Sequence, residues 1–121
     1  MGDSNSVIEK KSYFFALQII KLYKYLSTEK KDYTLSKQIL RAGTSIGANI
    51  VEALSAESKR DFVHKLGIAQ KEIKETSYWL NLLLDSEYIS KERFTELIKL
   101  CDELYRILTA IILTTKQRYL K

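Results

Sequence analysis

The sequence predicts an all-α fold: a single-domain, up-down-up-down antiparallel four-helix bundle. Three observations lead to this prediction. The 121 residues include no proline, apolar residues recur at alternating steps of three and four along four long segments, and only short polar turns separate those segments. Long consecutive helices joined by short turns run antiparallel. A chain of this length buries enough surface to fold around one core.

The first helix is predicted for residues 6–27, after a disordered N-terminus at residues 1–5. Its apolar seam keeps nearly to the helical period and consists of Ile8, Phe15, Ile19, Leu22 and Leu26. A second apolar row flanks this seam, with Tyr13, Phe14 and Leu17 on one side and Ala16, Ile20 and Tyr23 on the other. The polar residues of this helix are therefore confined to a narrow stripe.

The second helix is predicted for residues 34–56, with Thr34 as its N-cap. Its seam reads Leu35, Ile39, Ala42, Ile46, Asn49 and Ala53. Asn49 is the one polar member, so it needs hydrogen-bond partners and is expected to fix the register of the helix. Gly43 and Gly47 lie four residues apart among other small residues, a pattern that lets a neighbouring backbone approach closely.

The third and fourth helices are predicted for residues 59–85 and 90–119. Ser58 followed by Asp61 resembles a capping box, and Ser90 is the expected cap of the last helix. The seam of the third helix is Phe62, Leu66, Ala69, Ile73, Thr76, Leu80 and Leu83. That of the fourth is Phe94, Leu97, Cys101, Leu104, Leu108, Ile111 and Thr115. Both seams alternate steps of four and three, which supports the bundle.

The first and last helices carry wider apolar faces than a monomeric bundle needs. On the fourth helix a second row follows the seam at steps of seven residues. Exposed apolar rows of this kind mark protein contacts, so we expect a homo-oligomer. The candidate interface residues are Phe14, Tyr23, Gly43, Gly47, Ile98, Tyr105, Ile112 and Tyr119. The alternative is that the aromatic rings only widen the core of a small bundle.

Positive charge gathers at the two ends of the sequence. The net charge is +5, with +3 in residues 1–31, −1 in residues 32–57, 0 in residues 58–88 and +3 in residues 89–121. Because the first and last helices are neighbours in the bundle, their cations could share one side and attract phosphate backbones. The candidates are Lys10, Lys11, Lys21, Lys24, Arg106, Lys116, Arg118 and Lys121. An ordinary solvated face is the alternative.

No pattern of catalytic or metal-binding residues is present. The chain has one histidine, His64, and one cysteine, Cys101, whose apolar neighbours predict a buried hydrophobe. The sequence contains no Glu-x-x-His pair, no zinc-ligand spacing and no Gly-rich phosphate loop. We therefore expect no enzyme activity, no cofactor and no metal. No stretch is long enough to span a membrane and no signal peptide is visible, so we expect a cytoplasmic protein.

The segment SKQILRAGTSIGANIVEA at residues 36–53, continued by RDFVHKLGIAQKEIKETSYWL at residues 60–80, resembles the bacterial four-helix-bundle family of 23S rRNA intervening-sequence proteins. That family is related to the accessory variability determinant of diversity-generating retroelements. The resemblance implies a barrel-shaped homopentamer, and basic relatives bind nucleic acid and a reverse transcriptase. It also implies a polar network that joins the second helix to the third or to a neighbouring subunit, formed by Gln38, Arg41, Ser45, Asn49 and Glu52.

Together these features predict a non-enzymatic bundle that self-assembles into a basic ring and binds RNA, DNA or a nucleic-acid enzyme as an accessory protein. A structural or adaptor protein that binds only protein partners is the alternative.

Overall fold

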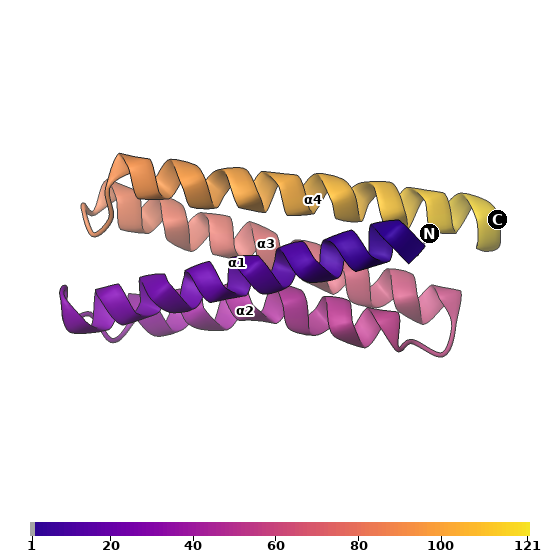
Figure 1. The fold of residues 1–121 in the computed structure, drawn as a ribbon, viewed down its shortest axis with the longest axis horizontal. Coiled ribbons are helices and arrows are strands. Elements are labelled where there is room, and N and C mark those ends of the chain that lie inside the picture. The colour runs from indigo at the N-terminus through magenta and orange to yellow at the C-terminus, as the bar shows by residue number, and fades with distance from the viewer. Residues whose placement is uncertain (1) are drawn as a thin grey trace.

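A computed structural model describes residues 2–121, with side chains from Asn5 onward. Its helices are α1 (Gly2–Thr28), α2 (Leu35–Leu54), α3 (Lys59–Asp85) and α4 (Lys91–Tyr119), and residues 2–121 contain no strand. Successive helices alternate in direction, and the start of α1 lies beside the end of α4 (Figure 1). Each helix contacts two others, in the cycle α1–α2–α3–α4–α1. The predicted four-helix bundle is confirmed.

Helix α1 begins earlier than expected, whereas α2 begins after Thr34 as expected but without the predicted side-chain cap. Helix α1 starts at Gly2, so residues 2–5 are helical and not a disordered end, while Met1 lies outside the described residues. Thr34 has helical backbone angles and makes no capping hydrogen bond. Asp32 replaces it: its Oδ2 accepts a hydrogen bond from the Ser36 N–H at 2.8 Å, and its carbonyl accepts one from Ser36 Oγ at 2.7 Å.

The last two helices begin with the serine caps that the sequence predicts. The Ser58 side chain accepts a hydrogen bond from the Asp61 N–H at 3.0 Å, and Ser90 Oγ accepts one from the Arg93 N–H at 3.1 Å. Each bond satisfies a backbone donor that the first turn leaves without a partner. None of the four helices has the length and apolar composition needed to cross a bilayer.

The predicted seams form the core, except that Leu35, Phe62 and Phe94 are only partly buried against it and Asn49 lies outside it. All five seam residues of α1 are buried. On α2 the fully buried residue is Ile50 and not Asn49, because the step after Ile46 is four residues and not three. Asn49 is only partly buried, and its Nδ2 donates to the carbonyl of Ser45 in its own helix at 2.9 Å. The expectation that Asn49 lies in the seam is therefore wrong.

Gly43 brings α1 and α2 together. A Cβ atom at this position would lie 2.7 Å from Ile19 Cγ1 and 2.9 Å from Ile19 Cγ2. Both helix backbones can approach this closely only because the side chain is missing. Four residues later, a Cβ at Gly47 would meet only the ordinary van der Waals surface of Ser12. The seam between α1 and α2 is therefore tight at Gly43 and opens toward Gly47.

Candidate functional site

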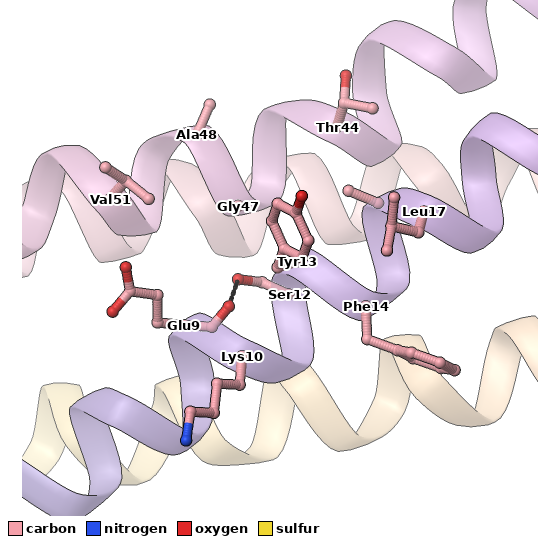
Figure 2. A pocket seen from close by; sticks show the side chains of 11 residues that line it. Glu9, Lys10, Ser12, Tyr13, Phe14, Leu17, Thr44, Gly47, Ala48 and Val51 are labelled. Atoms are coloured by element: carbon pink, nitrogen blue, oxygen red, sulfur yellow. Dashed lines mark hydrogen bonds between the residues drawn. The ribbon is translucent and has the colours of Figure 1, made fainter.

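Where the α1–α2 seam opens, it forms an apolar groove of about 620 Å³. The groove is lined by Glu9, Lys10, Ser12, Tyr13, Phe14, Ala16, Leu17, Thr44, Gly47, Ala48 and Val51. Small side chains on both helices create the hollow. Ser12 Oγ donates to the carbonyl of Glu9 at 3.0 Å, so this hydroxyl is satisfied within its own helix (Figure 2). We call this feature the α1–α2 groove.

Large apolar side chains border the α1–α2 groove and remain in solvent. The exposed fractions are 68% for Tyr13, 52% for Phe14, 43% for Leu17 and 51% for Val51. Figure 2 shows Tyr13 and Leu17 on the part of α1 that faces the α2 residues, whereas Phe14 points toward the ribbon of α4. A contiguous apolar patch of this kind is typical of a surface that binds another molecule.

The interface candidates on α1 and α2 separate into two groups. Phe14 and Gly47 line the α1–α2 groove. Tyr23 is only partly exposed, and Gly43 is buried against Ile19 of the same chain. Gly43 is therefore explained by the close approach of α1 and α2 and is not available to a second copy.

Three of the four candidates on α4 belong to the core or pack against it, which contradicts their assignment to an interface between copies, whereas Tyr119 is 50% exposed. Ile112 is only 9% exposed and belongs to the core, and Ile98 and Tyr105 pack against the core. Lysine side chains of α3 contact the rings of the two tyrosines: Lys74 Nζ lies 4.4 Å from the Tyr105 ring centroid, and Lys59 Nζ lies 4.6 Å from that of Tyr119. Long lysine stems cover apolar surface in this way while the charge stays in water.

The eight candidate nucleic-acid-binding cations do not share one side. Lys10 and Lys11 lie beside the α1–α4 seam, where Lys11 Nζ pairs with Glu103 Oε1 at 3.2 Å. Arg106 lines a hollow on the opposite flank of α4, facing α3. The others, Lys21, Lys24, Lys116, Arg118 and Lys121, are exposed. The expectation of a single basic side formed by α1 and α4 is therefore wrong, because residues of one helix project in different directions around its axis.

Two of the five residues of the predicted polar network, Arg41 and Glu52, make hydrogen bonds between α2 and α3. Arg41 Nη1 donates to Glu72 Oε2 at 3.1 Å, and Arg41 Nη2 donates to Glu75. Lys65 Nζ donates to Glu52 Oε1 at 3.1 Å. Ser45 and Asn49 instead bond to carbonyls of their own helix, and Gln38 is exposed.

Trp79 completes this network, and the motif alone did not point to it. Trp79 Nε1 donates to Glu75 Oε2 at 3.0 Å. The hydrogen bond from Trp79, followed by that from Arg41, lowers the pKa of Glu75. The carboxylate thus remains charged where α2 and α3 meet. An indole four residues after a glutamate, one turn along the same helix face, was the signal available in the sequence.

The one cysteine and the one histidine lie on different helices. Cys101 is buried, and burial raises the pKa of its thiol to about 12, which keeps the sulfur protonated. His64 is exposed on α3. Among the described residues, no group of three or more His, Cys, Asp or Glu side chains is arranged to hold a metal ion.

Comparisons with known proteins agree with this architecture. A sequence model of the family described as 23S rRNA-intervening sequence protein matches residues 4–110. Comparison with curated proteins gave no match. A crystal structure of a protein of unknown function, from the S23 ribosomal protein family of Bacteroides thetaiotaomicron, is 49% identical with a TM-score of 0.89. The similarity covers 90% of this chain and 97% of that one. Since the family match extends over most of the sequence, the chain belongs to the 23S rRNA-intervening sequence protein family.

Proposed function

We propose that this protein is a non-enzymatic, self-assembling subunit whose oligomer binds nucleic acid or a nucleic-acid enzyme as an accessory protein. The observation that carries the proposal is the α1–α2 groove, which the chain leaves open to solvent. A second copy seated there would remove the exposed apolar surface from water. The proposed assembly is a homopentameric ring, in line with the resemblance to barrel-shaped relatives.

The free energy gained by burying the exposed aromatic side chains can be compared with the cost of association. Tyr13 and Phe14 together expose on the order of 200 Å² of side chain, and burying that area contributes roughly 5 kcal/mol. Association costs about 4–15 kcal/mol in lost motional freedom, so the aromatic pair offsets only the lower part of this range. Leu17 and Val51 add further apolar area, and a polar rim must complete the ~800 Å² per partner typical of stable interfaces.

Matched leucine substitutions test the self-assembly. Leu17→Lys places a charge in the α1–α2 groove, whereas Leu82→Lys changes a leucine of similar exposure on α3, 36% against 43%. We expect the wild type and Leu82→Lys to share one oligomeric mass by light scattering, and Leu17→Lys to have the mass of a single chain. Helical circular dichroism should be the same for all three. An unchanged mass for Leu17→Lys would rule out the groove as the interface.

The nucleic-acid part of the proposal rests on charge. Each chain carries a net +5, so five copies carry 5 × 5, or about +25, a field that raises association with polyanions. Binding of random RNA should be strong at low salt and fall steeply as salt rises, because bound counterions are released. A wild-type protein that does not shift RNA in a gel at low salt would end this part of the proposal.

The second candidate function is an adaptor that binds only protein. The α1–α2 groove supports it equally, because an amphipathic helix of another protein fits an apolar groove between two helices. Recovery of a specific protein partner after nuclease treatment, together with a monomeric mass for the isolated chain, would favour the adaptor. The proposed location is the cytoplasm, where free thiols such as Cys101 are usual.

A further inference from the structure

Ion pairs are unevenly distributed among the helix seams. At the α2–α3 seam, Arg41 pairs with Glu72 and Glu75, and Lys65 pairs with Glu52. At the α1–α4 seam, Lys11 pairs with Glu103. Within residues 5–121, no ion pair crosses the α3–α4 seam. Three carboxylates of α3 and α4 thus pair with cations on the flanks that face away from this seam.

Cations at the α3–α4 seam lie on aromatic rings instead. Lys74 stacks on Tyr105 and Lys59 on Tyr119, with the ammonium nitrogens 4.4 Å and 4.6 Å from the ring centroids. A cation–π contact orients an ammonium group but leaves its charge uncompensated. The positive charge of these lysines therefore remains available to an anion.

Two cations of α4 extend the same surface. A hollow of about 230 Å³ brings Lys74, Tyr105 and Arg106 together, and Asp102 is the one acidic residue that lines it. Lys116 follows Tyr105 by about three helical turns and so projects from the same side of α4. All four cations are exposed. We call Lys59, Lys74, Arg106 and Lys116 the basic seam.

We infer that the basic seam binds the phosphodiester backbone of a nucleic acid. This inference rests on the nucleic-acid binding proposed above and assigns it to one surface. Lys59 and Lys74 are separated by about four turns of α3, or roughly 22 Å. At about 3.4 Å per nucleotide of one strand, this length spans roughly six phosphates. Cations spread along such a length recognise the backbone and not the base sequence.

The position of the basic seam is compatible with self-assembly. Because α1 contacts α2 and α4 while α3 also contacts α2 and α4, the α1–α2 and α3–α4 seams lie on opposite sides of the bundle. A copy seated in the α1–α2 groove therefore contacts the side of the bundle opposite the basic seam. By contrast, Lys10 lines the groove itself, so assembly would cover it.

Two double substitutions that remove equal charge test this assignment. One is Lys59→Gln with Lys74→Gln in the basic seam, and the matched control is Lys21→Gln with Lys24→Gln on the exposed face of α1. Binding is measured by fluorescence anisotropy between 50 and 300 mM salt. The probes are 20-nucleotide oligouridine, the corresponding oligodeoxythymidine and an RNA duplex. The three probes distinguish RNA from DNA and single strands from duplexes.

Each phosphate contact with a single strand contributes about 0.7 to the slope of log affinity against log salt. Loss of two contacts should therefore reduce the slope by about 1.4 and weaken binding roughly 60-fold at 50 mM salt. Arg106→Gln, which removes one contact without uncovering either tyrosine, should cost roughly eightfold. The Lys21 and Lys24 control should keep the wild-type slope. Replacing Lys59 and Lys74 with arginine should retain binding, since the charge is kept.

The outcomes separate this inference from the proposed function. Equal losses in the seam double variant and its control would overturn the assignment to the basic seam while nucleic-acid binding stands. Absence of wild-type binding to every probe at 50 mM salt would overturn both. Displacement of oligouridine by polyglutamate at equal charge concentration would overturn the inference in favour of an acidic protein partner. Unchanged helical circular dichroism in each variant excludes unfolding as the cause.

Discussion

Adding one methyl group at Gly43 should destabilise the bundle, although alanine favours helix formation. The new Cβ would lie 2.7 Å, 2.9 Å and 3.2 Å from Cγ1, Cγ2 and Cβ of Ile19. Ile19 is fully buried and β-branched, so it has little freedom to move away. Overpacking of this kind costs about 1–3 kcal/mol, against about 1 kcal/mol gained from helix propensity. The expected net change is a loss of up to about 2 kcal/mol.

Gly67 provides the control, because a Cβ added there meets nothing within 4 Å. Gly67→Ala should stabilise the protein by about 0.5–1 kcal/mol through propensity alone. Urea unfolding followed by circular dichroism at 222 nm compares both variants at one fixed protein concentration, because association shifts apparent stability by mass action. If Gly43→Ala stabilised the protein as much as Gly67→Ala does, the close approach of α1 and α2 would be refuted.

Three further predictions concern the polar network, the thiol and the core. Because the pKa of Glu75 is lowered in the folded state, its ionised carboxylate stabilises the fold above the usual pKa of about 4.5, and this stabilisation is lost as pH falls below that value. In Glu75→Gln the melting temperature should therefore depend less on pH between pH 5 and 3. Cys101, with a thiol pKa of about 12, should react with Ellman's reagent at pH 8 only after unfolding, and fast reaction of the folded protein would contradict its burial. Ile112→Asp should abolish helical circular dichroism, because it places a carboxylate in the core. A variant that stays folded would contradict the burial of Ile112.

The sequence predicts the bundle well because the helical period records which face of each helix is apolar. Phe15, Ile19 and Leu22 are buried as their spacing indicates. Periodicity does not show which helix covers a neighbouring row. Tyr105 therefore looked like an interface residue, whereas Lys74 of the same chain lies on its ring.

The candidate site was only partly predictable for a related reason. Charge summed over residues 58–88 is zero, yet the acids and bases of α3 project to different sides. Glu72 and Glu75 face Arg41 of α2, while Lys74 faces α4. A sum along the sequence hides this separation. The flank of Tyr13, Phe14 and Leu17 was visible in the sequence, but the hollow beside it depends on small residues of α2 brought close by Gly43.

Sedimentation velocity of the full chain over a hundredfold dilution tests the central claim most directly. If the α1–α2 groove needs a second copy to cover it, the particle should have a mass several times the 14.1 kDa of one chain at micromolar concentration, and it should dissociate only on strong dilution. A particle of 14.1 kDa at every concentration would contradict self-assembly.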